Sequence, residues 1–222
     1  TVDKSGTSTS VCGVSVTAEG KALYAVQDVA KLTGENAIGH EKILPEHYNP
    51  IIRKIRSLKK PVVCAVNGVA AGAGANIALC CDIVVAASSA SFIQAFSKIG
   101  LIPDSGGTYF LPRLIGFQKA SALMMTGDKV SAAEAEKMGM LYKIFEDAQF
   151  AEESFTLANM LSLMPTQGLA FTKMALNGSM QRSMEEQLQE EDTLQRKAGS
   201  TEDYSEGVAA FLETRKPVFT GK

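Results

Sequence analysis

Short apolar runs rich in β-branched residues alternate with small-residue segments in the middle of the chain, and this pattern predicts an α/β core. Val62–Val66 and Ile83–Ala87 are two such runs, and each predicts a buried strand. Between them, Ala75–Cys81 is a compact stretch of small and apolar residues that predicts a buried helix. The turn Gly72-Ala73-Gly74 precedes that helix, so the predicted order is strand, glycine turn, helix, strand.

Weaker patterns predict the elements around this centre. Apolar residues at helical spacing indicate an amphipathic helix over Pro50–Leu58, after a loop over Leu32–Asn49. Ser131 and Glu134 have the spacing of a capping box, which opens a helix. The other expected elements are strands over 11–17, 91–92 and 140–145, and helices over 108–115, 118–126, 132–138, 148–163, 166–179, 183–198 and 203–214. Strand–helix units therefore occupy residues 1–145 and helices alone occupy 146–222, which we treat as two regions.

The glycine turn is the clearest chemical signal, because the first N–H groups of the following helix have no intrahelical partner and favour negative charge. A dinucleotide-binding fingerprint would need a third glycine after Gly74, and a phosphate loop would need a Gly-Lys-Ser/Thr ending; both are absent. An oxyanion hole, in which backbone N–H groups meet charge that develops during a reaction, fits the turn. Tight packing of helix on strand without any ligand fits it equally well.

Composition narrows the function classes. The chain has 222 residues, of which 45% are hydrophobic, enough for one substantial core. Its formal net charge of −2 and the lack of a basic stripe argue against nucleic-acid binding. No apolar run is long enough to span a membrane, and the polar start does not resemble a signal peptide. The four cysteines show no disulfide or metal-ligand spacing, so we expect no metal site and a reducing, cytoplasmic setting.

Three blocks then occur in an order that resembles the enoyl-CoA hydratase/isomerase (crotonase) family. They are NGVAAGAGANIALCCDIVVAA at 67–87, IGLIPDSGGTYFLPRLIG at 99–116 and MMTGDKVSAAEAEKMGMLYKI at 124–144. The resemblance implies a crotonase-like spiral of ββα units, followed by a C-terminal helical trimerisation region. Compared with the family pattern, we expect the N-terminal strand–helix unit to be missing here or replaced by Thr1–Thr17, and the sequence leaves open whether the chain is truncated.

The resemblance also assigns roles in binding an acyl-CoA thioester. The N–H groups of Ala73 and Gln27 would form the oxyanion hole, and the turn residues Gly72 and Ala73 would lie against the substrate. Lys21, Ala25 and Gln27 would contact the coenzyme A portion. The segment Leu23–Asp28 departs from the family pattern, because Val26 replaces a glycine and Tyr24 is bulky for its position.

The side chains that would move protons differ from those of the hydratases in the family. Hydratases carry two glutamates, and this chain has Asn76 and Phe96 at the matching positions, neither of which accepts a proton. Asp104, in IPDSGG, matches the carboxylate of the family's isomerases and becomes the candidate catalytic base. From the residues alone, Asp104 could instead cap the helix that follows it.

These features predict an isomerase with one carboxylate, Asp104, and a backbone oxyanion hole. The block AFSKIGLIPDSGGT is most similar to isomerases that act on 1,2-epoxyphenylacetyl-CoA in phenylacetate catabolism; a 3-enoyl to 2-enoyl-CoA isomerase fits the same residues. An enoyl-CoA hydratase, an aryl-CoA dehalogenase-like enzyme and a non-catalytic CoA-binding subunit remain alternatives. The resemblance implies no separate cofactor, since coenzyme A belongs to the substrate, and it implies a cytoplasmic homotrimer or homohexamer.

Overall fold

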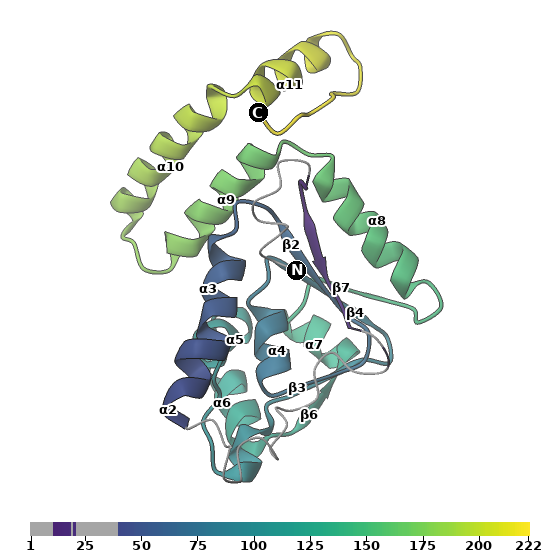
Figure 1. Cartoon of the computed structure of the whole chain (residues 1–222), viewed down its shortest axis with the longest axis vertical. Helices are drawn as coiled ribbons and strands as arrows, with labels where there is room; N and C mark the ends of the chain where they lie inside the picture. The colour runs from purple at the N-terminus through teal and green to yellow at the C-terminus, as the bar shows by residue number, and fades with distance from the viewer. Residues whose placement is uncertain (1–10, 19, 21–39) are drawn as a thin grey trace. The chain divides into compact units, whose positions relative to one another are not determined.

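The computed structural model describes residues 11–18, 20 and 40–222, and these form two compact units. The core unit comprises residues 15–56 and 63–155, and the C-terminal unit comprises residues 1–14, 57–62 and 156–222. Figure 1 shows strands and helices together in the first unit and helices in the second. Among the described helices, none is both long enough and apolar enough to cross a membrane.

A mainly parallel sheet lies at the centre of the core unit. Its strand order is β1-β2-β4-β7, and the strands are β1 (Val14–Val16), β2 (Val62–Val66), β4 (Ile83–Ala87) and β7 (Lys143–Phe145). β2 and β4 pair in parallel, as do β4 and β7. Every residue of β2 is buried, as expected for a strand covered on both faces. The α/β fold predicted from the apolar runs is therefore confirmed.

A second sheet has the order β3-β5-β6, with strands β3 (Val69–Ala71), β5 (Ser91–Ile93) and β6 (Lys129–Ser131). β3 pairs with β5 in parallel, and β5 pairs with β6 antiparallel. The sequence patterns gave no separate strand at β3 or β6. β3 matters for the site, because it ends directly at the glycine turn.

The core unit also contains helices (Figure 1). They are α2 (His40–Lys42), the π-helical segment η2 (Ile43–Tyr48), α3 (Asn49–Ser57), α4 (Ala73–Leu79), the 3-10 helix η3 (Ala95–Ile99), α5 (Gly107–Ile115), α6 (Phe117–Thr126) and α7 (Ala132–Met138). The loop expected over Leu32–Asn49 is wrong for residues 40–48, which are helical. The capping box is confirmed: Ser131 Oγ accepts from the Glu134 N–H at 3.3 Å, and Glu134 Oε2 accepts from the Ser131 N–H at 3.0 Å.

The C-terminal unit contains the end of α8 (Phe150–Ser162), followed by α9 (Thr166–Ser179), α10 (Met184–Gly199) and α11 (Glu202–Leu212). The residues after α11 fold back onto it. The Asp203 carboxylate accepts from the Thr220 and Gly221 N–H groups at 2.7 and 2.9 Å. Glu206 accepts from Arg215 and from the Val218 N–H, at 2.6 and 2.8 Å. Two carboxylates therefore hold the C-terminal segment against α11.

Candidate active site

The glycine turn leads from β3 into α4 through a backbone conformation that suits glycine alone. Gly72 has φ 54° and ψ −125° and forms the N-cap of α4. Its own N–H donates to the Ile93 carbonyl at 2.9 Å, as part of the pairing of β3 with β5. Ala73 is the first helical residue, so its N–H has no intrahelical partner. Of these two N–H groups, that of Ala73 is the one placed to meet a negative oxygen.

Apolar side chains surround this turn. A Cβ built on Gly72 would lie 3.6 Å from Cζ of Phe96, whose side chain is buried. Ile43 and Tyr48 of η2 form a buried cluster with Ala73. Backbone donors in such a water-poor environment stabilise a developing negative charge far more strongly than they would in water.

Asp104 lies in a segment with unusual backbone geometry, immediately before α5. Ser105 has φ 51°, which is uncommon for a residue other than glycine, and Gly106 follows with φ 78°. α5 begins at Gly107, its N-cap is Gly106, and no side chain caps it. The Asp104 backbone carbonyl, not its carboxylate, accepts from the Gly107 N–H at 2.8 Å. The capping role considered for the Asp104 side chain is therefore wrong, and the carboxylate is left for another use.

The Asp104 carboxylate is half-buried, and this raises its pKa above the ordinary value of an aspartate. A hydrogen bond from Ser105 Oγ, at 2.8 Å to Asp104 Oδ1, opposes that rise without cancelling it. A carboxylate with a raised pKa is a better proton acceptor than a fully solvated one. Backbone strain and a perturbed carboxyl at one place are typical of functional sites.

Asn76 is a buried side chain whose role sequence reasoning missed. It lies one turn into α4 from Ala73 and is 0% exposed. Asn76 Nδ2 donates to the Asp104 carbonyl at 2.8 Å, and Asn76 Oδ1 accepts from Gln94 Nε2 at 2.8 Å. A polar side chain inside an otherwise apolar helix was the signal that could have pointed to such a buried partner.

The other predicted residues divide into two groups. Lys21, Ala25 and Gln27 lie outside the described residues, so their assignment to coenzyme A and to the oxyanion hole stays a prediction. Asp82, at the end of the helix–strand turn, pairs with Arg56 of α3 at 2.9 Å, in agreement with a structural role.

Cys64, Cys80 and Cys81 are buried, and none of them forms a disulfide with another described residue. Cys64 and Cys80 have pKa values raised by their hydrogen bond to Cys81 and by burial, so these thiols stay protonated and behave as small apolar groups.

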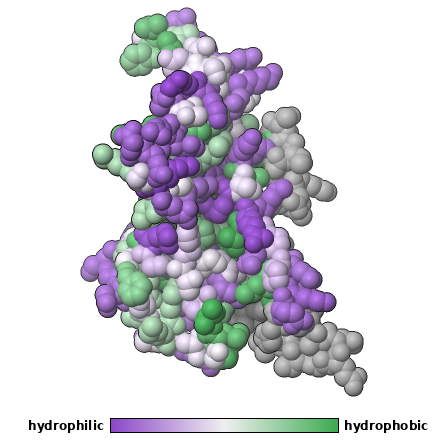
Figure 2. Space-filling view, turned by 90° about the vertical axis from the view of Figure 1, so that its left-hand side faces the viewer, coloured by the Kyte–Doolittle hydropathy of each residue, from purple (hydrophilic) through white to green (hydrophobic). Residues whose placement is uncertain are grey.

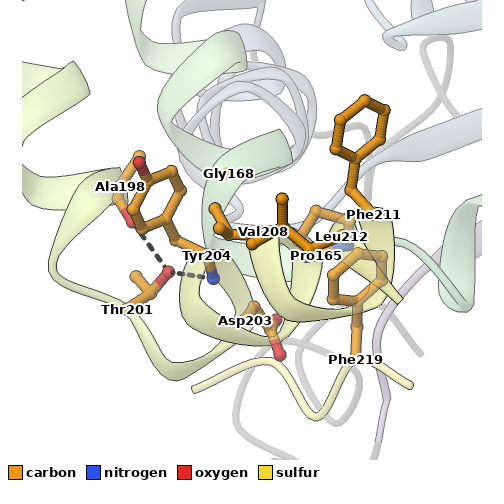
Figure 3. A pocket seen from close by; sticks show the side chains of 11 residues that line it. Pro165, Gly168, Ala198, Thr201, Asp203, Tyr204, Val208, Phe211, Leu212 and Phe219 are labelled. Atoms are coloured by element: carbon orange, nitrogen blue, oxygen red, sulfur yellow. Dashed lines mark hydrogen bonds between the residues drawn. The ribbon is translucent and has the colours of Figure 1, made fainter. Parts of the chain in front are cut away.

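The C-terminal unit contains a separate cavity of about 410 Å³ whose walls are almost wholly apolar. Figure 3 shows the residues that line it, which come from the start of α9, the end of α10, α11 and the segments before and after α11. Thr201 Oγ1 closes the turn before α11, donating to the Ala198 carbonyl at 2.7 Å and accepting from the Tyr204 N–H at 3.1 Å. The lining residues are Pro165, Gly168, Ala198, Thr201, Asp203, Tyr204, Gly207, Val208, Phe211, Leu212 and Phe219. None of them can accept a proton from a substrate carbon except Asp203, whose carboxylate already binds two backbone N–H groups.

Comparison with known proteins places the chain among enzymes that act on acyl-CoA thioesters. The family model for enoyl-CoA hydratase/isomerase matches residues 2–222. A 1,2-epoxyphenylacetyl-CoA isomerase of Escherichia coli is 50% identical over 175 residues, which are 79% of this chain and 67% of that protein. A probable enoyl-CoA hydratase of Rhodobacter capsulatus is 41% identical over 207 residues, covering 93% of this chain and 80% of that protein.

The fold gives the same result. The crystal structure of a Mycobacterium abscessus protein described as an enoyl-CoA hydratase/isomerase superposes with a TM-score of 0.93 at 33% identity, covering 100% of this chain and 86% of that one. A glycine turn that opens a buried helix, with a half-buried carboxylate before the next long helix, thus occurs in a chain that matches the family from residue 2 to its last residue. We conclude that the chain belongs to the enoyl-CoA hydratase/isomerase family.

Proposed function

We propose that this protein is an isomerase of acyl-CoA thioesters in which Asp104 is the single proton-transferring carboxylate. The observation that carries the proposal is the state of the Asp104 side chain: it is half-buried, has a raised pKa and does not cap α5. The N–H groups of Ala73 and Gln27 would hold the thioester oxygen. Lys21, Ala25, Gln27 and Gly72 would contact the rest of the coenzyme A thioester, which enters as part of the substrate.

The chemistry follows from the acidity of the carbon next to the thioester. Asp104 would take a proton from this α-carbon, and the electrons would move onto the thioester oxygen to give an enolate. One well-placed N–H donor to such an oxyanion is typically worth about 3 kcal/mol. Asp104 would then return the proton to the γ-carbon, which converts a 3-enoyl thioester into a 2-enoyl thioester. The net reaction needs neither water nor a second side-chain base.

Hydration is disfavoured by the residues at the two glutamate positions. Asn76 uses its amide for buried hydrogen bonds, and Phe96 presents a buried apolar ring near the turn. Addition of water requires one group to activate the water and a proton donor for the carbon. Asp104 can serve only one of these functions at a time.

The finer assignment is the substrate. The E. coli relative is named for 1,2-epoxyphenylacetyl-CoA, and it shares half of the aligned residues with this chain. We infer that this chain acts on the same epoxide or on a 3-enoyl-CoA, because both reactions need an oxyanion hole but no activated water.

Isotope exchange tests the proposal directly. Wild-type protein and Asp104→Asn would be incubated with 2-hexenoyl-CoA in deuterium oxide, with 1,2-epoxyphenylacetyl-CoA assayed in parallel. Wild type should incorporate deuterium at the γ-carbon or move the double bond, with little 3-hydroxyacyl product. Asp104→Asn should lower that rate by a factor of about 10²–10⁴, because general-base catalysis is lost while the shape is retained.

The matched control is Asp128→Asn, the same change at an exposed aspartate in the core unit, and it should keep the wild-type rate. Two results would overturn the proposal. The first is hydration at least as fast as isomerisation, which would require another base. The second is near-wild-type exchange by Asp104→Asn.

A further inference from the structure

Two buried amide side chains support the segment that carries Asp104 through hydrogen bonds. Asn76 of α4 and Gln94, just after β5, are 0% and 5% exposed, and they are hydrogen bonded to each other at 2.8 Å. Asn76 also donates a hydrogen bond to the Asp104 backbone carbonyl, at 2.8 Å. The result is a line of hydrogen bonds from Gln94 through Asn76 to the main chain of Asp104.

The Asp104 carbonyl determines which atom of each amide donates and which accepts. A backbone carbonyl can only accept, so the Asn76 atom that faces Asp104 must be the NH₂ group. Asn76 Oδ1 then faces Gln94 and requires a donor from it, which Gln94 Nε2 supplies. Gln94 Oε1 is left buried without a hydrogen-bond partner among the described residues.

Asn76 is also held by close packing from the side of α5. A Cβ placed on Gly107 would lie 2.3 Å from Asn76 Nδ2, so the first turn of α5 lies directly against the amide. The same end of β5 also supports the glycine turn, because the Ile93 carbonyl accepts from the Gly72 N–H at 2.9 Å. Residues 93 and 94 therefore contact both parts of the candidate site, the turn before Ala73 and, through Asn76, the segment of Asp104.

We propose that Asn76, oriented by Gln94, is a positioning residue that fixes the Asp104 carboxylate relative to the glycine turn. The inference rests on the proposed function of Asp104 and adds how its position is set. Asn76 takes no part in proton transfer itself. Its place in α4, one turn after Ala73, lets a single rigid helix determine where both the oxyanion donor and the carboxylate segment lie.

A double-mutant cycle tests this role, with γ-proton exchange of 2-hexenoyl-CoA in deuterium oxide as the assay. Asn76→Ala should lower kcat by roughly 10–100-fold with little change in KM, since a misplacement of about 1 Å can cost up to about 100-fold. In an Asp104→Asn background, Asn76→Ala should change the residual rate less than about twofold, because no carboxylate remains to be positioned. Hydrogen exchange at the Gly107 amide should become faster in Asn76→Ala.

Two further variants distinguish a loss of positioning from a loss of overall stability. Gln94→Met keeps the length of the side chain but cannot donate to Asn76, and it should lower kcat in the same direction by a smaller factor. Val85→Ala removes core packing in the buried strand β4, which carries none of the candidate site residues, and it should lower the melting temperature without changing kcat.

The outcomes separate the two proposals. An equal loss from Asn76→Ala in both backgrounds, or none in wild type, would overturn the positioning role and leave the role of Asp104 intact. Near-wild-type activity of Asp104→Asn would overturn both.

Discussion

The charged form of the Asp104 carboxylate is less favourable in the folded protein than in water. Its ionisation therefore affects the stability of the fold as well as the proposed chemistry. Burial raises its pKa, so the folded state holds the proton more tightly than the unfolded state does. Between the unfolded pKa, about 3.9, and the higher folded pKa, the folded state binds more protons, and stability falls as pH rises. Above the folded pKa the whole cost of the buried charge is present.

Asp104→Asn should therefore be more stable than wild type at neutral pH, and the difference should shrink as pH falls through the raised folded pKa toward the ordinary aspartate pKa. Urea denaturation at a series of pH values measures both proteins. The acid side of the wild-type kcat/KM profile should also show an apparent pKa above the ordinary aspartate value. A wild type that is the more stable protein at neutral pH would contradict the unfavourable placement of the charge.

The close packing at Gly107 gives a second prediction at the scale of one residue. Gly107→Ala should destabilise the protein by about 1–3 kcal/mol, because the added Cβ would overlap the Asn76 amide at 2.3 Å in a well-packed interior. Gly199→Ala is the matched control, since it lies in α10 with no atom within 4 Å of the new Cβ. That change should be neutral or stabilising by about 0.4–1 kcal/mol. Equal effects at the two glycines would show that Asn76 does not limit the space at Gly107.

The sequence predicted the candidate site in part. The glycine turn and Asp104 were selected from the sequence, because their residue types and spacing within the ordered blocks are specific, and their roles stay predictions. Asn76 was recognised only as a missing glutamate, and Gln94 was not considered, since a buried amide pair depends on contacts between residues 18 positions apart in the chain. The periodicity of apolar residues shows which face of an element is apolar, but it does not show which polar groups contact one another in the interior.

At the scale of elements, long or strongly bounded segments were predicted most closely, and of the three-residue strands β1, β5 and β7 were predicted while β3 and β6 were not. β2, β4 and the four C-terminal helices agree with their predicted ranges within a few residues. α4 begins at Ala73, two residues before the predicted start, because Gly72 forms its N-cap. The helical segment at 40–48 was taken for a loop, since its apolar residues are few and Pro45 interrupts them. Its burial against Ala73 is a tertiary contact that local pattern does not show.

The segment after α11 supplies a prediction at this scale. Asp203→Ala should release residues 216–222, because the buried carboxylate accepts from two backbone N–H groups and hydrogen bonds to a charged group are worth about 1.5–3 kcal/mol each. Amide hydrogen exchange at Thr220 and Gly221 should become much faster. Glu202→Ala is the control, because Glu202 shares the first turn of α11 and its favourable dipole but not these bonds. Equal exchange rates in the two variants would contradict the assigned contacts.

At the scale of the whole molecule, the surface of the C-terminal helices is uneven. Figure 2 shows a largely hydrophilic surface in the upper part of the view, with hydrophobic side chains at its upper end. On α11, Phe211 is 84% exposed and Leu212 is 76% exposed. Large apolar side chains that gather on one exposed helix are typical of contact surfaces between subunits. We infer that the C-terminal helices assemble the protein into a trimer or a pair of trimers.

Sedimentation velocity at micromolar concentration should show a trimer or a hexamer. Replacement of both Phe211 and Leu212 by aspartate should shift the protein to smaller species, because charge would enter an apolar contact surface. Glu213→Gln, a change at an exposed polar neighbour, should leave the assembly intact. A stable monomer of the wild-type protein, or a double variant with unchanged assembly, would rule out this surface.

The amide of Asn76 also bears on how enzymes of this fold can change their reaction in evolution. A glutamate at this position could serve water, but its carboxylate could not donate to the Asp104 carbonyl and would face the close packing of Gly107. One position can therefore support the Asp104 segment or supply a second acid–base group, and it cannot do both. If Asp104 acts as proposed, a change of Asn76 to glutamate alone would remove the support of the Asp104 segment without completing a water site, so several contacts would have to change together. The two chemistries should thus occur as distinct sets of residues at these positions and not as a graded series.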